Sequence, residues 1–124
     1  MEKRIKEQWI KALTSGTYKQ GQHRLKQTVN GRKVFCCLGV LCDIYGHEKN
    51  VPWDSASPAD KIGNAETFLD ERLFLPLKVI EWAGLGNIAQ SILHFGDDES
   101  LTLDHANDTG FGFKEIAKVI KEQL

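Results

Sequence analysis

Asn30 and Gly31 separate two short runs, 25–29 and 32–35, that favour extended backbone. Asn and Gly tolerate the positive φ angles of a two-residue turn, so the pair predicts a β-hairpin over about residues 24–36. A hairpin of this kind commits the chain to antiparallel strand pairing, whatever else it forms.

Helical periodicity lies on both sides of the hairpin. Apolar side chains recur on one face of residues 2–14, and Ser15 and Gly16 supply a stop. After the hairpin, the spacing predicts a buried helix from Cys37 that ends at Gly46. Three further helices are expected. The first runs from Pro76 to Gly84 with Leu77, Ile80 and Ala83 inward, the second from Leu101 to Ala106 behind a Ser100 cap, and the third over about 113–123. A strand is expected over 88–95.

We therefore predict an α+β fold, a small and mainly helical domain with one β-hairpin (about residues 24–36) and a C-terminal amphipathic helix. A chain of 124 residues with 41% hydrophobic residues normally buries one core, so we expect a single domain over 1–124. Residues 47–70 lack periodicity and contain two prolines and a glycine. We expect a loop-rich or mobile segment there.

The formal net charge of -1 hides an asymmetry. Residues 1–34 hold nine Lys and Arg against two Glu, whereas residues 35–124 hold seven against fifteen acidic residues, so the two parts carry +7 and -8. No Asp or Glu lies between Gln8 and Cys42. Cations without neighbouring carboxylates attract a phosphate-bearing ligand or an acidic protein surface. Oppositely charged parts of one chain can face each other within the fold or across subunits, and we expect a homo-oligomer. The near-neutral total charge argues against a nucleic-acid partner.

Three cysteines, Cys36, Cys37 and Cys42, form no even disulfide framework and lack the paired spacing of structural zinc sites. Free cysteine is most often buried, so we expect core residues here, with no catalytic residue, no metal and no cofactor. No apolar run approaches the roughly 20 residues that cross a bilayer, and nothing near Met1 resembles a signal peptide. We expect a cytoplasmic protein without a membrane partner.

The connection over residues 18–24 is the first candidate ligand site. It combines an aromatic ring, two cations and several amides, which suit phosphate and base recognition, although a solvated loop has the same composition. The second candidate is a polar turn before the last helix, whose amide and carboxylate suit either a ligand edge or the turn itself. The residues expected to bind the ligand are Tyr18, Lys19, Gln20, Arg24, Trp82, Asn107 and Asp108.

Four segments carry a family resemblance: WIKALTSGTYKQ at 9–20, FCCLGVLCD at 35–43, LPLKVIEWAGL at 75–85 and NDTGFGFKEIA at 107–117. Over nearly its whole length the chain resembles a group of small phage and prophage proteins of unassigned function. Ala106 stands where that pattern commonly has a larger aliphatic residue, and Gly112 where it commonly has a capping Ser or Thr. The resemblance implies a phage context, in which many small proteins counter host immunity by sequestering a nucleotide or binding a defence protein.

The leading hypothesis is a phage-type small protein that binds and sequesters a phosphate-bearing nucleotide signal molecule, without catalysis. Two alternatives stay open: an inhibitor that binds a host defence protein through its basic surface, and a small enzyme that acts on a nucleotide. The leading hypothesis predicts that Lys19→Ala, Arg24→Ala and Asn107→Ala each abolish nucleotide binding and leave the thermal transition nearly unchanged.

Overall fold

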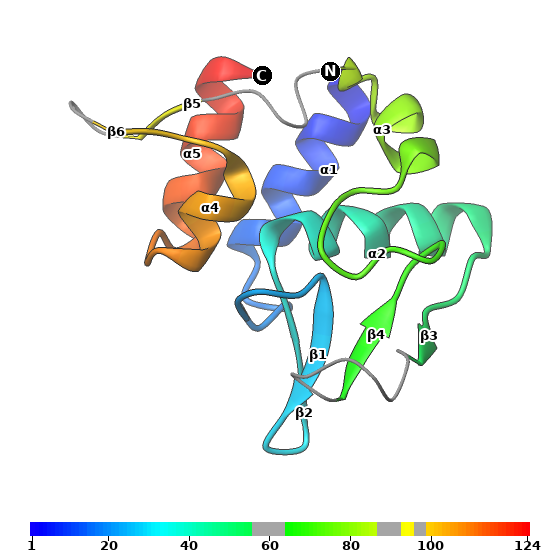
Figure 1. Ribbon diagram of the computed structural model, residues 1–124. Coiled ribbons are helices and arrows are strands. Elements are labelled where there is room, and N and C mark those ends of the chain that lie inside the picture. The colour runs from blue at the N-terminus through cyan, green and yellow to red at the C-terminus, as the bar shows by residue number, and fades with distance from the viewer. Residues whose placement is uncertain (56–63, 87–92, 96–98) are drawn as a thin grey trace.

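Figure 1 shows the computed structural model, in which residues 1–55, 64–86, 93–95 and 99–124 are described. The helices gather in one part of the molecule and a small antiparallel sheet lies at the other end, next to α2, which confirms the predicted α+β class. The elements in chain order are α1 (Lys3–Thr14), β1 (Lys26–Val29), β2 (Arg32–Phe35), α2 (Cys37–Lys49), β3 (Asp54–Ser55), β4 (Ala65–Thr67), α3 (Leu77–Ala83), β5 (Leu93–Phe95), β6 (Glu99–Leu101), α4 (Leu103–Asp108) and α5 (Phe113–Gln123).

The predicted hairpin is present. Asn30 and Gly31 adopt the positive φ angles that the turn requires, 51° and 76°. β1 and β2 pair antiparallel, with Gln27 opposite Val34.

Two further strands enlarge the hairpin into a four-stranded sheet of order β2-β1-β4-β3. Both lie inside the segment 47–70, where the sequence shows no strand periodicity. The Glu66 carboxylate on β4 lies 3.7 Å from Lys26 Nζ and 2.8 Å from Lys33 Nζ. Opposite charges on adjacent strands stabilise their pairing, so Glu66 favours the pairing of β4 with the basic hairpin. The one expected hairpin is thus part of a larger sheet.

α2 continues past Gly46, where the sequence predicts its end. Gly46 is helical, and its missing side chain lets the Val51 carbonyl and the Phe68 ring approach closely. The helix ends instead at Asn50, which adopts a left-handed conformation with φ 57°.

α3 and α4 differ in detail from the predicted helices. Pro76 and Gly84 bound α3 as predicted, but Leu77 is 68% exposed rather than inward, and Val79 and Ala83 fill the inner face. α4 begins after Thr102 rather than Ser100, because β6 occupies the preceding residues and pairs with β5. Of the expected strand over 88–95, only the part from residue 93 lies within the described residues.

The core lies where α1, α2 and α5 meet. Trp9 on α1 is completely buried, and its indole N–H donates a 3.0 Å hydrogen bond to the Cys37 carbonyl at the start of α2. Ile116 and Ile120 of α5 belong to the same hydrophobic cluster. The amphipathic stripes that predict α1 and α5 are therefore buried against each other, and α1 also packs against α2. Within the described ranges, no helix has the length and apolar content that a bilayer crossing demands.

The first turn of α2 lies directly against the backbone that enters β1. A methyl group at Gly39 would overlap the Leu25 carbonyl oxygen, which already accepts a hydrogen bond from Cys36 N. Neither backbone segment can move away without breaking the hydrogen bond between Cys36 N and the Leu25 carbonyl. Gly39 is thus required by close approach and not by an unusual backbone angle.

We expect Gly39→Ala to lower the free energy of unfolding by about 3 kcal/mol, since the added methyl meets backbone and not a movable side chain. Urea denaturation followed by circular dichroism measures the change. Gly112→Ala is the matched control, because a methyl there has only ordinary contacts and costs about 1 kcal/mol at a helix N-cap. Equal losses in the two variants would contradict the close-approach argument.

Candidate functional site

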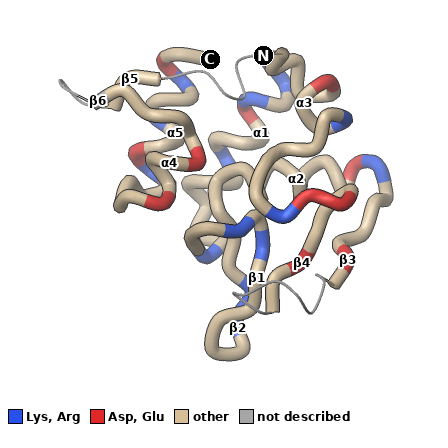
Figure 2. The backbone as a smooth tube through the Cα atoms, in the orientation of Figure 1, with Lys and Arg blue, Asp and Glu red and all other residues tan. Residues whose placement is uncertain are grey.

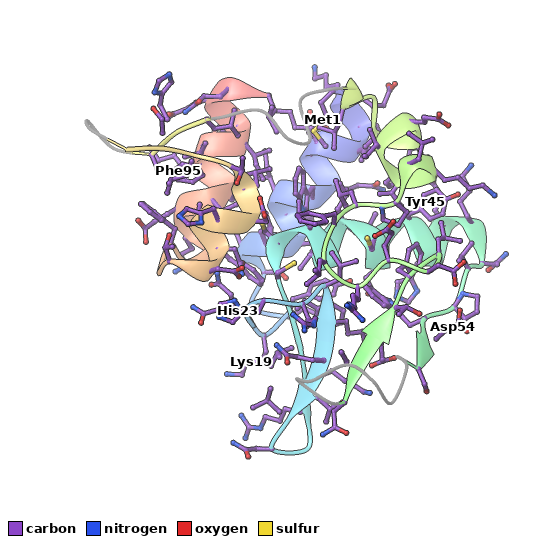
Figure 3. The ribbon with its side chains drawn as sticks, viewed as in Figure 1. Met1, Lys19, His23, Tyr45, Asp54 and Phe95 are labelled. Carbon is purple, nitrogen blue, oxygen red and sulfur yellow. The ribbon has the colours of Figure 1, made fainter. Side chains whose placement is uncertain are left out.

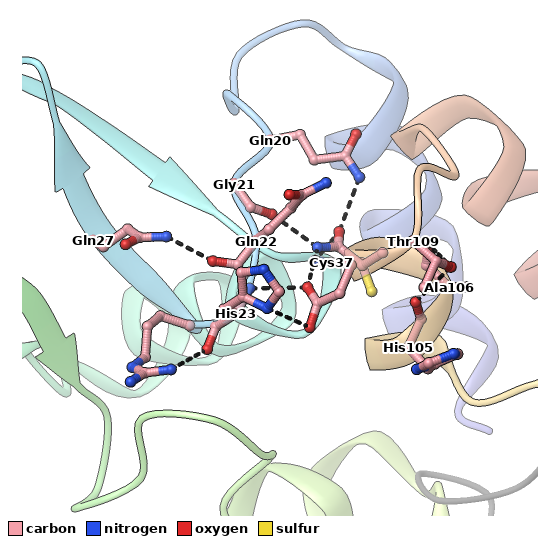
Figure 4. A network of polar contacts seen from close by, with 12 residues as sticks. Gln20, Gly21, Gln22, His23, Gln27, Cys37, His105, Ala106 and Thr109 are labelled. Carbon is pink, nitrogen blue, oxygen red and sulfur yellow. Dashed lines mark hydrogen bonds and ion pairs between the residues drawn. The ribbon is translucent and has the colours of Figure 1, made fainter. Parts of the chain in front are cut away.

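Asn107 lies at a buried polar junction between α4, α2 and the loop before β1. Figure 4 shows this network of polar contacts, with Gly21 and Cys37 labelled. Its amide nitrogen donates to the Gly21 carbonyl (2.8 Å) and to Asp108 Oδ1 (3.2 Å). Its amide oxygen accepts from Cys37 N (3.1 Å) and Gln20 Nε2 (3.0 Å). The side chain is fully buried and has partners on both polar atoms, so its immediate role is to join three segments.

Gln20 and Asp108 extend this junction. The Gln20 side chain donates to the Phe111 carbonyl and accepts from Phe113 N, the first residue of α5. The Asp108 carboxylate accepts from His23 N (2.9 Å) and lies 3.5 Å from the His23 ring nitrogen Nδ1. The structure thus brings together three of the residues predicted to bind a ligand and uses their polar groups inside the fold. Their role as ligand contacts stays a prediction.

A small cavity of 220 Å³ opens beside the junction. Arg24 lines it and donates from its guanidinium to the His23 carbonyl (2.7 Å). The remaining lining residues are His23, Cys36, Leu73, Phe74, Asp104 and Asp108. We call this space the α4 cavity.

A larger groove of 610 Å³ lies between α1 and α2. Its volume falls in the range of about 300–1,000 Å³ that is typical of small-molecule sites. Residues from the C-terminal half of α1, the following loop and the second half of α2 line it. They are Gln8, Lys11, Ala12, Ser15, Thr17, Tyr18, Ile44, His47 and Glu48. We call this space the α1–α2 groove.

Asp43 organises one wall of the groove. Its carboxylate accepts a 2.6 Å hydrogen bond from the Tyr18 hydroxyl and a 3.0 Å bond from the Trp53 indole, and it lies 3.3 Å from His47 Nε2. Burial and this hydrogen bond raise the pKa of Tyr18 well above its usual value, so the hydroxyl stays protonated. The Tyr18 ring packs edge-on against Phe35, with ring centroids 5.0 Å apart. Tyr18 is therefore held rigidly at the groove.

Glu48 forms the other polar edge of the groove. Arg4 donates to its carboxylate at 2.7 Å and the Trp82 indole at 2.5 Å, and these hydrogen bonds lower the pKa of the Glu48 carboxyl. Trp82 packs edge-on against Tyr45, and its contact with the groove runs through Glu48. Its predicted role as a ligand contact stays a prediction. Because Glu48 is already paired with Arg4, the carboxylate competes little for the charge of Lys11.

Five of the six cations of the acid-free stretch, all but Arg24, separate into two groups. Lys26 and Lys33 pair with Glu66, and Lys26 also lies over the Phe35 and Trp53 rings. Lys11, Lys19 and Arg32 are exposed and form no ion pair with any residue that the structure describes. Figure 2 shows the basic positions along the hairpin and acidic ones on α4, and Figure 3 shows the Lys19 side chain projecting outward. Lys19 lines neither the groove nor the α4 cavity.

The cysteines are buried, as predicted. Burial raises the pKa of Cys36 to about 12 and those of Cys37 and Cys42 well above the usual value, so the thiols are neutral and poor nucleophiles. Cys36 caps α2, since its sulfur accepts from Gly39 N at 3.4 Å. The described residues contain no group of three His, Cys, Asp or Glu side chains suited to a metal ion.

Sequence reasoning missed Lys11 and His47 as groove residues. Lys11 is one of six cations in the acid-free stretch, and nothing local distinguishes it. Its relation to His47 appears only when α1 packs beside α2. A helical projection of α2 would have placed His47 with Ile44 and Glu48 on one face, which is the available signal.

We expect Asn107→Ala to lower the free energy of unfolding by about 3 kcal/mol, because it leaves Cys37 N and the Gly21 carbonyl without their partner. This corrects the expectation that the substitution spares the thermal transition. Lys19→Ala is the control and should leave stability within about 0.5 kcal/mol of the natural chain. Urea denaturation of both variants tests the assignment, and an unchanged midpoint for Asn107→Ala would refute it.

The full chain, residues 1–124, matches a family described as a domain of unknown function, DUF8296. No curated protein and no solved structure shows a significant match. The match extends through both cavities and the Asn107 junction, and it brings no activity with it. The chain therefore belongs to the DUF8296 family of domains of unknown function.

Proposed function

We propose that the protein binds a small phosphate-bearing nucleotide in the α1–α2 groove and holds it without chemical change. The observation that carries the proposal is the composition of that groove, the larger of the two cavities described above. It places the cation of Lys11 and the rings of Tyr18 and His47 around one space of suitable volume. A nucleotide offers both an anion and an aromatic face to such a set.

Binding without catalysis is the form of the proposal that the side chains favour. The three thiols are buried and neutral, and the Tyr18 hydroxyl is committed to Asp43. His47 is the groove residue with acid–base capacity, and Asp43 faces one of its ring nitrogens. A small enzyme acting on a nucleotide would use this pair, so recovery of the intact ligand is the observation that separates the two functions.

The biological setting is the second part of the proposal and is supported by the resemblance to small phage and prophage proteins. A phage protein that holds a nucleotide signal molecule in the host cytoplasm would lower its free concentration and so counter host immunity. Sequestration needs tight binding and slow release, and it needs no turnover. Self-association through the oppositely charged parts of the chain would add sites in each particle.

A thermal-shift screen against nucleotides, cyclic dinucleotides and cyclic trinucleotides tests the proposal. A ligand present at 100 times its Kd stabilises the folded state by about 2.7 kcal/mol, which is readily measured. Lys11→Ala should weaken binding by about tenfold or more, since it removes a charge-assisted contact with phosphate. Lys3→Ala, on the same helix and outside the groove lining, is the matched control.

The ligand should be recovered intact after the complex is denatured. Conversion of the ligand during incubation would establish the enzyme instead. Silence across the whole panel, or equal affinity of Lys11→Ala and Lys3→Ala, would remove the groove from consideration.

An inhibitor of a host defence protein is the second candidate. Lys19 and Arg32 favour it, because both are exposed and without an ion pair among the described residues, as an acidic partner surface would require. Such binding should weaken steeply as salt rises and should be lost in a Lys19→Glu, Arg32→Glu double variant, whereas groove binding should not.

A further inference from the structure

Of the described residues that line the α1–α2 groove, His47 is the one whose side chain belongs to the type that changes charge between pH 5 and 8. Its side chain is 79% exposed, so water and a ligand both reach it. We propose that protonated His47 is the second phosphate contact of the groove beside Lys11, so that the ligand binds more tightly as the pH falls. This inference rests on the proposed function, because it takes the groove as the place where phosphate binds.

Asp43 determines which ring nitrogen of neutral His47 carries the proton. The Nε2 atom lies 3.3 Å from Asp43 Oδ2, one helical turn earlier on α2. An ionised carboxylate only accepts hydrogen bonds, so it favours the neutral tautomer with the N–H at Nε2. Nδ1 then carries a lone pair, as the oxygens of a phosphate do. The neutral ring therefore offers no hydrogen-bond donor to a phosphate at Nδ1.

Protonation of His47 turns Nδ1 into a donor. An imidazolium carries an N–H on both ring nitrogens, so Nε2 can stay with Asp43 while Nδ1 donates to a ligand. No hydrogen bond or ion pair engages Nδ1 in the part of the chain that the structure describes. A hydrogen bond between two charged groups is stronger than one between neutral groups. One proton thus supplies both a positive charge and a correctly placed donor.

The Asp43 carboxylate is itself held in place. The Tyr18 hydroxyl donates to Oδ2 at 2.6 Å, and the Trp53 indole donates to Oδ1 at 3.0 Å. These two donors come from different segments of the chain and fix the carboxylate against the end of the imidazole ring. They also take up part of its hydrogen-bonding capacity, which leaves the imidazolium charge available to a ligand. Asp43 is therefore a positioning residue and His47 the ligand contact.

The other charged groups around the groove keep their charge over the same pH range. Lys11 on α1 is a permanent cation, and Tyr18 keeps its proton, as described above. The Glu48 carboxylate lies 2.7 Å from Arg4 and 4.0 Å from Lys49, so it is compensated by its own partners. The positive charge that the groove gains as the pH falls therefore comes from His47.

Titration of the ¹⁵N-labelled protein with 3′,5′-cyclic AMP, at about pH 5.5 and at about pH 8, tests the inference. The phosphodiester of this probe keeps one negative charge at both values, whereas a phosphate monoester takes up a proton of its own near about pH 6. We expect amide shifts at residues 8–18 and 44–48, with an affinity about fivefold or more higher at the lower pH.

Two histidine variants locate the effect. His47→Gln carries no charge at either pH and should bind the probe equally at both. His105→Gln is the matched control, because His105 is exposed on α4 and lies outside the groove lining. This control should keep the full pH dependence of the natural chain.

The possible outcomes separate this inference from the proposed function. Groove shifts with equal affinity at both pH values, or an unchanged pH dependence in His47→Gln, would reject the role of His47 and leave the groove as a nucleotide site. Tighter binding at the higher pH would reject it as well. An absence of groove shifts at both pH values would overturn the inference, and silence in the nucleotide screen would remove the proposed function with it.

Discussion

The buried start of α2 is the point on which the rest of the structure depends. The first N–H groups of a helix have no partner within the helix, and here they lie away from water. Asn107, seventy residues further along the chain, supplies an acceptor to Cys37 N, and the Cys36 sulfur supplies one to Gly39 N. Without these two acceptors the helix could not enter the core at this place.

Both cavities are consequences of how α2 is held. Its N-terminal end, with Cys36, forms part of the α4 cavity, and its C-terminal half carries His47 and Glu48 to the groove. The junction around Asn107 also positions the loop that contains His23 and Arg24. A change that loosens the start of α2 should therefore disturb both spaces, whereas changes at the groove leave the junction intact.

Local pattern was sufficient for the hairpin and for α1 and α5, because a turn pair and an amphipathic stripe act over a few residues. It was insufficient for β3 and β4, because β4 joins the sheet by pairing with β1, about forty residues earlier in the chain, where Glu66 lies opposite Lys26. The residues predicted to bind a ligand also fall into two groups. Tyr18 and Arg24 do line cavities, but the polar character that suggested ligand contact for Asn107 and Gln20 serves internal hydrogen bonds. Only tertiary packing decides between those roles.

The buried thiols of α2 have a practical consequence. Cys37 and Cys42 lie on this helix and are completely buried, so an alkylating reagent reaches them only when the helix opens. The rate of their alkylation therefore reports how often α2 opens, and the measurement needs no engineered label. A ligand that binds only the folded protein should slow this alkylation by a factor that grows exponentially with the free energy it adds to the folded state.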